Sequence, residues 1–142
     1  MPNRRALVAA SAVQLTSGLV GQVVALRRRL HYDVPFMTGS PDHVARDSWW
    51  FGSAISAPSY MLAAQAWGIA RLLRGPDERA RQALRLLGTG MVGGYLSERV
   101  CRRRLTPAGF DPVETPIVVV GFAGTVAMAV LSRPRGQDGV RP

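Results

Sequence analysis

A chain of 142 residues is long enough for one domain and no more. Its formal net charge of +9 comes from 18 basic residues, all arginine, and such an excess can indicate a nucleic-acid partner. The arginines instead cluster at the ends of apolar runs, where they can reach lipid head groups, and no basic face with interleaved aromatic residues exists. The sequence therefore excludes a nucleic-acid partner and predicts that the arginines interact with a lipid bilayer. The use of arginine in place of lysine predicts a GC-rich bacterial source.

Charged residues are absent from four stretches of the sequence and crowded between them. These stretches are residues 6–26, 48–70, 86–97 and 115–132. A bilayer core about 30 Å thick requires roughly 20 apolar helical residues, whereas a soluble helix of this length carries charges on its outer face. The pattern predicts an all-α polytopic protein of the plasma membrane, a four-transmembrane-helix bundle. Its spans are expected at about residues 6–26, 48–72, 84–101 and 114–132.

The first helix is expected over residues 4–29. Small and polar residues at steps of three and four, including Gly18 and Gly21, share one face and would let a second helix approach closely. The apolar run behind Arg4 and Arg5 also has features of a signal peptide, but it exceeds the apolar core of about 7–15 residues that signal peptides have. We therefore interpret it as an uncleaved helix.

The second helix is expected to begin at Pro41, a residue type favoured in the first helical turn, and to continue to about residue 73. Its first two turns would form an extension in the membrane interface. Trp49 and Trp50 would then lie at the level of the lipid head groups, where amphipathic rings collect. Pro58 lies in the middle of this helix and is expected to kink it.

The third helix is expected over residues 76–104, with an amphipathic, interfacial first part at residues 79–85. Gly90 and Gly94 form a GxxxG pair and predict a tight contact with another helix. The uncharged part of this helix is shorter than the bilayer core, and a half-inserted segment is the alternative.

The fourth helix is expected over residues 112–132, with Asp111 as its cap and Glu114 as the capping partner. Residues 1–135 would then form a single transmembrane domain, followed by a disordered polar tail at residues 136–142.

An even number of spans places both ends and the middle loop on one side of the membrane. That side carries ten of the arginines and the other side carries eight. Because cytoplasmic loops are enriched in basic residues, the sequence predicts cytoplasmic termini and a multi-pass topology.

The first and third loops bring together most of the acids and both histidines. His43 and Asp47 are four residues apart, so they share a helix face and could act as general acid and base. Glu98 ends a span, where a charge is costly, and Arg99 and Arg102 offer it a plain structural partner. The candidate catalytic residues are Asp33, His43, Asp47 and Glu98, and the candidate substrate-lining residues are Trp49, Trp50 and Tyr95. Ordinary solvated loop charges are the competing interpretation, and no metal or cofactor site is predicted.

Two functions remain open at this level. The first is association through helices, either between copies of the chain or with a larger membrane partner, for which the helix-packing residues are Gly18, Gly21, Gly90 and Gly94. The alternative is a membrane-embedded enzyme that acts on a lipophilic small molecule with the candidate residues at the loop face. A channel or carrier formed by several copies is a third hypothesis.

Overall fold

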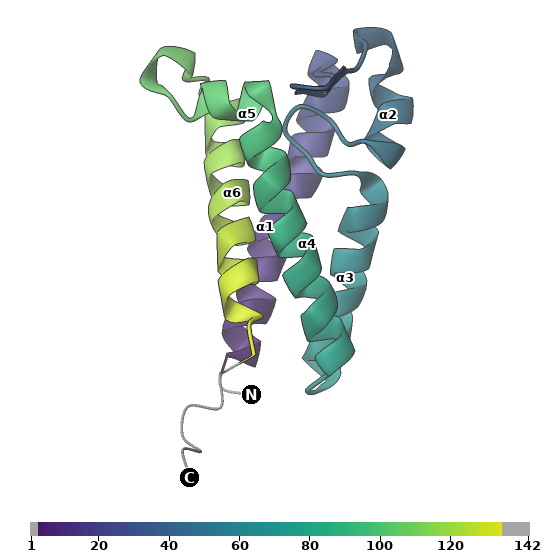
Figure 1. The fold of residues 1–142 in the computed structure, drawn as a ribbon, viewed down its shortest axis with the longest axis vertical. Helices are drawn as coiled ribbons and strands as arrows, with labels where there is room; N and C mark the ends of the chain where they lie inside the picture. Colours follow the sequence, from purple (N-terminus) through teal and green to yellow (C-terminus); the bar gives the residue numbers. More distant parts are fainter. Residues whose placement is uncertain (1–2, 135–142) are drawn as a thin grey trace.

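The computed structural model describes residues 3–134, and these residues are mainly helical (Figure 1). Four long helices lie side by side: α1 (Arg4–Arg28), α3 (Ser59–Arg74), α4 (Glu78–Ser97) and α6 (Glu114–Leu131). Each contacts two others, in the cyclic order α1, α3, α4, α6. The predicted helical character is thereby confirmed. The predicted tail at residues 136–142 lies outside the described residues.

The short elements gather at one end of the long helices, which we call the loop end (Figure 1). They are β1 (Asp33–Val34), β2 (Met37–Thr38), the 3-10 turn η1 (Pro41–His43), α2 (Val44–Trp50), α5 (Arg99–Arg104) and the 3-10 turn η2 (Pro107–Gly109). Strands β1 and β2 pair antiparallel as a small hairpin. The start of α1, the end of α6 and the turn between α3 and α4 lie at the opposite end, which we call the terminal end.

Two of the long helices, α1 and α6, are long and apolar enough to cross a membrane. At 1.5 Å per residue, the 25 residues of α1 extend about 37 Å and the 18 residues of α6 about 27 Å. The 20 residues of α4 extend about 30 Å, whereas the 16 residues of α3 extend only about 24 Å. Helix α3 is short because the chain leaves the helical conformation before it.

The prediction of one kinked helix over residues 41–73 is wrong. Helix α2 ends at Trp50, residues 51–58 are irregular, and α3 begins after Pro58, whose backbone is extended (ψ 145°). Pro58 has no N–H to donate within a helix, and its ring disfavours a helical residue before it. Gly52 takes a φ of +85°, a conformation that suits glycine. The proline therefore separates two helices here and does not kink one.

The irregular stretch, which we call the 51–58 segment, is attached to three other parts of the chain. The N–H of Ala54 donates to the carbonyl of Leu30 (3.3 Å), and its carbonyl accepts from the thiol of Cys101 (3.0 Å). The Ser56 hydroxyl donates to the carbonyl of Gly18 on α1 (3.0 Å). Residues 52–56 are all buried, so this stretch of non-helical backbone is enclosed by protein.

The prediction of one helix over residues 76–104 is also wrong. Helix α4 begins after Asp77, whose carboxylate accepts from the N–H of Ala80 (3.0 Å), and it ends at Ser97. Glu98 has an extended backbone (ψ 121°) and starts α5 as its cap. The first turns of α4 are amphipathic as predicted, since Ala80 and Leu84 are fully buried while Arg79 and Gln82 are exposed.

The interior between the long helices has an apolar cluster toward each end and a polar layer between them. One cluster includes Ile55, Tyr95 and Val118, and the other includes Leu7, Leu72 and Leu84. In the polar layer the side-chain amide of Gln65 donates to the carbonyl of Ser11 (2.9 Å) and to Oε1 of Gln14 (2.8 Å). These bonds tie α3 to α1 through buried groups.

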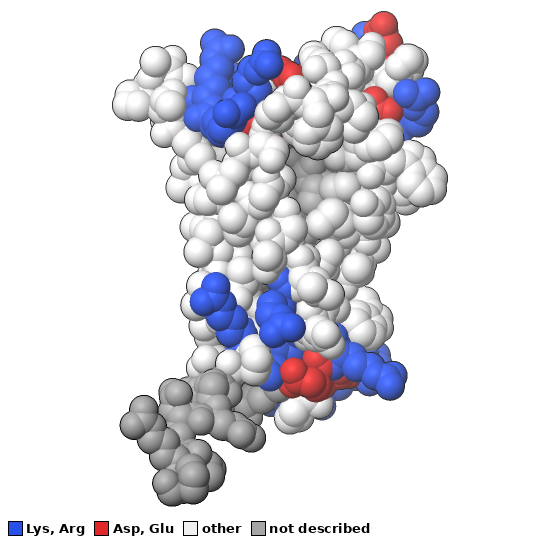
Figure 2. All heavy atoms as spheres, viewed as in Figure 1, with Lys and Arg blue, Asp and Glu red and all other residues white. Residues whose placement is uncertain are grey.

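Charged side chains lie at both ends of the molecule, and a broad uncharged band separates them on the face shown in Figure 2. At the loop end Glu114 accepts from Arg28 (2.8 Å) and from Arg104 (2.6 Å). At the terminal end Asp77 accepts from Arg71 (2.7 Å). Because Glu114 is engaged by two arginines, it does not complete the predicted reciprocal cap, although Asp111 does accept from its N–H (2.8 Å).

Candidate functional site: a cavity beneath the hairpin

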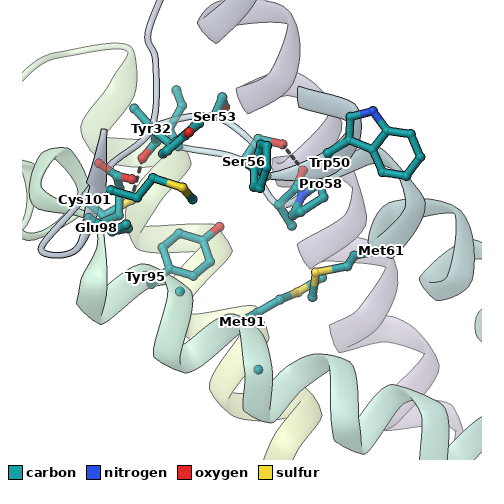
Figure 3. Close-up of a pocket in the computed structure, with 18 of the residues that line it drawn as sticks. Tyr32, Trp50, Ser53, Ser56, Pro58, Met61, Met91, Tyr95, Glu98 and Cys101 are labelled. Carbon is teal, nitrogen blue, oxygen red and sulfur yellow. Dashed lines mark hydrogen bonds between the residues drawn. The ribbon is translucent and has the colours of Figure 1, made fainter. Parts of the chain in front are cut away.

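A cavity of about 350 Å³ lies near the loop end, between α4 and the 51–58 segment (Figure 3). Figure 2 shows a hollow on the side of the molecule, below the charged groups of the loop end. Helix α4 contributes one wall, the 51–58 segment and the start of α3 contribute the opposite wall, and the hairpin with its neighbours closes the top. The lining side chains include Met91 and Tyr95 from α4. Ser53, Ser56 and Met61 line the opposite wall, and Tyr32, Val34 and Met37 line the top. Glu98 and Cys101 lie at one end.

The cavity exists because both walls lack side-chain volume where they face one another. Gly90 and Gly94 line it from α4, and a Cβ atom at either position would meet no heavy atom within 4 Å. On the other side, the break before Pro58 replaces the first turns of a longer α3 with the 51–58 segment. The space is thus a direct consequence of two glycines and one proline.

Glu98 is the charged residue among those that line the cavity, and it is 5 % exposed. Both of its carboxylate oxygens accept from the N–H of Asp33 (3.0 and 2.9 Å), and Oε1 also accepts from the N–H of Val100 (3.4 Å). Glu98 follows the last residue of α4 and lies outside the four long helices. Burial raises the pKa of this carboxyl to about 7, although the two backbone donors oppose that shift.

Glu98 differs from every other acidic residue in the part of the chain that the structure describes, because it forms no ion pair. The seven others each pair with an arginine: Asp33, Asp42, Asp47, Asp77, Glu78, Asp111 and Glu114. Neither structural partner that the sequence suggested for Glu98 pairs with it, since Arg99 pairs with Asp33 (3.3 Å) and no ion pair joins Arg102 to Glu98.

Two other polar groups of the cavity wall differ in how they are satisfied. The Oγ atom of Ser53 is buried and has no hydrogen-bond partner among the described residues. The thiol of Cys101 donates to the carbonyl of Ala54, and burial raises the pKa of that thiol. Cys101 is therefore protonated at neutral pH and is a poor nucleophile, whereas Ser53 has hydrogen-bonding capacity left over.

The structure brings together only part of the predicted catalytic set. Asp33 lies beside Glu98, because its backbone N–H donates to the Glu98 carboxylate. The carboxylate of Asp33 itself pairs with Arg99, and Asp33 does not line the cavity. His43 is exposed, and Asp47 is buried against Arg46 (3.1 Å); neither lines the cavity. The proposed general acid and base are thus not assembled around one space.

The three aromatic residues predicted to line a substrate also separate. Trp50 and Tyr95 line the cavity from opposite sides, while Trp49 is 64 % exposed and lies outside the lining. Tyr32 and Phe51 were not among the predicted substrate-lining residues, yet both line the cavity, with ring centroids 5.5 Å apart. Only the turn at residues 51–58 and the hairpin bring these rings together, and neither is visible in the spacing of the residues.

The glycines selected from the sequence take two different positions. A Cβ on Gly18 would approach Leu62 (2.9 Å), and one on Gly21 would approach the carbonyl oxygen of Ile55 (2.8 Å), so both lie at close contacts of α1. Gly90 and Gly94 line the cavity, and a Cβ at either position would meet no heavy atom within 4 Å, so neither lies at a close approach of two helices within residues 3–134. The close approach of α4 to α6 occurs instead at Gly88, where a Cβ would lie 2.9 Å from the backbone nitrogen of Ala129.

The chemistry of the cavity is that of a binding site with one acidic end. Its walls are mostly apolar and aromatic, and its polar groups are concentrated at Glu98, Ser53 and Ser56. Among residues 3–134 no group of three potential metal ligands is present. Comparisons of the chain with models of protein families, with curated proteins and with solved structures find no match.

Proposed function

We propose that this chain is a four-span protein of the plasma membrane that binds a lipophilic molecule in the cavity beneath its hairpin. The observation that carries the proposal is the cavity itself, because about 350 Å³ of largely apolar space with a few polar groups at one end is typical of a small-molecule site.

The membrane location is supported by the surface between the two charged ends. Exposed side chains there include Val13, Leu19 and Val23 of α1 and Val120 and Val126 of α6. A soluble protein rarely exposes so continuous an apolar surface. The 51–58 segment is consistent with this location, since non-helical backbone at membrane depth is tolerated where protein encloses it.

Four crossings by α1, α3, α4 and α6 would place this hollow against lipid. Helices α3 and α4 are less suited to crossing a membrane by length and composition than α1 and α6. Their position in the bundle supports a crossing, because each packs between two other long helices. A lipophilic molecule could then enter the cavity sideways from the bilayer without passing through water.

The first test fills the cavity from α4. Leucine at Gly94 would place a side chain in the open space of the cavity, whereas leucine at Gly93, which is equally free of neighbours but is not a lining residue, would not. Native mass spectrometry of protein released gently from detergent should show a reproducible small-molecule mass on the wild type and on Gly93→Leu. Gly94→Leu should lose it. Equal retention by all three proteins, or no bound molecule on any of them, would contradict the proposal.

Association of copies through α4 is a second candidate function. Gly90, Gly93 and Gly94 are all exposed and leave one side of α4 without side-chain bulk, as close helix packing requires. The same spectra count subunits. If association is the function, Gly93→Leu should reduce the oligomer to a monomer, and no small-molecule mass should depend on Gly94.

The enzymatic alternative has less support than either candidate. Of its four proposed acid–base residues only Glu98 lines the cavity, and His43 is exposed. Simultaneous replacement of Asp33, His43, Asp47 and Glu98 by alanine would test this enzyme, and a retained cellular phenotype would exclude it.

A further inference from the structure

The unpaired carboxyl of Glu98 requires an explanation in this chain. The sequence holds 18 arginines against nine acidic residues, so cationic partners are abundant. Every other described acid uses one, including Asp33, whose N–H binds Glu98 directly. The exception is a carboxyl that is 5 % exposed and lines a cavity. A buried charge without a partner is costly, and a partner from outside the chain would remove that cost.

Glu98 has unused capacity to accept hydrogen bonds. A carboxylate has about four acceptor positions, and its protein donors are two backbone groups, the N–H of Asp33 and the N–H of Val100. One donor comes from the hairpin and the other from α5, so the backbone holds the carboxyl in place and leaves acceptor positions unused. Ser53, whose buried hydroxyl has no partner among the described residues, adds a second free acceptor to the cavity lining from the 51–58 segment.

The aromatic residues near this end have the right chemistry for a positive charge. Tyr32 and Tyr95 line the cavity beside Glu98 (Figure 3), and Phe51, whose ring centroid is 5.5 Å from that of Tyr32, also lines it. Aromatic faces attract ammonium groups, and sets of such rings are used to recognise quaternary ammonium ligands. Figure 3 shows Glu98, Tyr32 and Tyr95 toward one side of the cavity and Met61 and Met91 toward the other. The space therefore has an acidic, aromatic end and an apolar, flexible end.

We propose that the ligand is a single-chain lipophilic cation, whose ammonium head binds at Glu98 and Ser53 and whose apolar chain lies along Met61, Met91 and the two glycines of α4. This inference rests on the proposed function. A volume of about 350 Å³ is near the lower limit for drug-sized ligands and suits one chain, not a two-chain phospholipid. A phospholipid head would also bring a phosphate next to a carboxylate, which like-charge repulsion opposes.

Three probes with the same eight-carbon chain test the inference: octylammonium, whose N–H groups can donate to Glu98 and Ser53, octan-1-ol and octanoate. Each is titrated into nanodiscs that carry the protein, and its partition into empty nanodiscs is subtracted. The cation should bind about tenfold more tightly than the alcohol, since charge pairing and ring contact together favour it by this order. Octanoate should not bind above the empty discs.

Two variants separate the inference from the function on which it rests. Glu98→Gln keeps an oxygen for the N–H of Asp33 but removes the charge, and it should weaken the cation about tenfold while leaving the alcohol unchanged. Gly94→Leu should weaken both probes. Asp47→Asn is the matched control, because Asp47 is also a buried acid of the loop end but lies outside the lining, and this variant should bind both probes as the wild type does.

The outcomes are distinguishable. If the wild type binds cation and alcohol equally, or if Glu98→Gln binds both as the wild type does while Gly94→Leu binds neither, the cationic ligand is excluded and the lipophilic site remains. If no probe exceeds the empty discs, both proposals fail. The comparison of the three probes on the wild type needs no variant, so it stands even if Glu98→Gln does not fold.

Discussion

At the scale of a single residue, Glu98 is held in an environment that opposes its charge. Burial raises its pKa from an ordinary value of 4.5 to about 7, with a smaller contribution from the nearby carboxylate of Asp33, which is itself paired with Arg99. Between these two pH values the unfolded chain has released the proton and the folded chain still holds it. The stability that Glu98 contributes is therefore fully present below about pH 4.5 and is lost as the pH rises to 7.

This linkage predicts that the melting temperature in detergent falls as the pH rises from 5 to 8, by an amount of the order of a few degrees. Glu98→Gln removes the titrating group and should flatten the dependence. The comparison between the two proteins is the measurement, because the histidines and all other groups are present in both. A wild type and a variant with parallel melting profiles would show that Glu98 does not titrate in this range.

Residue-level reasoning from the sequence found part of the site. Glu98, Trp50 and Tyr95 were selected because a charge at the end of a span is costly and because rings collect near interfaces, and all three line the cavity. His43 and Asp47 were selected from their spacing, which shows that two residues share a helix face but not where the face points. Ser53 carried no signal, because an unpartnered hydroxyl can be recognised only when its surroundings are known.

At the scale of the element, α4 carries glycines with opposite roles, and a matched pair of alanine variants tests this. At Gly88 a Cβ would lie 2.9 Å from the backbone nitrogen of Ala129 and 3.2 Å from the carbonyl oxygen of Thr125, and backbone atoms of a packed helix cannot easily move. Gly88→Ala should destabilise the protein by about 1–3 kcal/mol. Gly93→Ala, with nothing within 4 Å, should be neutral or stabilising, because alanine favours a helix by about 1 kcal/mol. Chemical denaturation of both variants in the same detergent measures the difference, and equal stability would contradict the packing of α4 on α6.

The boundaries of the elements show why helices two and three were predicted too long. Pro41 does begin a helical turn, the 3-10 turn η1, where the hydroxyl of Ser40 accepts from the N–H of Asp42, whereas α4 begins at Glu78, two residues later than predicted. The breaks in these two helices were missed because the local sequence permits both outcomes. Pro58 can kink a helix or end one, and Glu98 is a good helix former that instead takes an extended conformation to cap α5. Contacts with β1 and with the 51–58 segment decide between these outcomes, and such contacts are not local in the sequence.

At the scale of the whole molecule, the ion pairs lie at the two ends, and several polar side chains between them bond to neighbouring helices. Gln65 binds α1 in this middle region, and Ser17 donates to the carbonyl of Ile117 on α6 (2.7 Å). The segregation of charge that first indicated four spans is thus reproduced in three dimensions (Figure 2). This segregation could be predicted from the sequence, because charges that flank each helix of an antiparallel bundle come to lie at one end of the bundle or the other.

The number of crossings can be measured by the accessibility of single cysteines in sealed membrane vesicles. Phe36, which is 83 % exposed, and Ala108 lie at the loop end, and Gly75 lies in the turn at the terminal end. The native Cys101 is buried and should not react. Four crossings with both termini cytoplasmic predict that Phe36→Cys and Ala108→Cys react with a membrane-impermeant maleimide from the outside, while Gly75→Cys reacts only after permeabilisation.

The same three variants discriminate the alternatives, because each topology gives its own pattern. If only α1 and α6 cross the membrane, residues 36, 75 and 108 all lie on one side and react together. If the four-span protein has the opposite orientation, the pattern is inverted: Gly75→Cys reacts first and the other two need permeabilisation. The two-span pattern would remove the basis for lateral entry from lipid, because α3 and α4 would then lie outside the bilayer, and the apolar cavity between them would face water. An inverted four-span pattern would leave the cavity and its acidic end intact and would place them in the opposite leaflet.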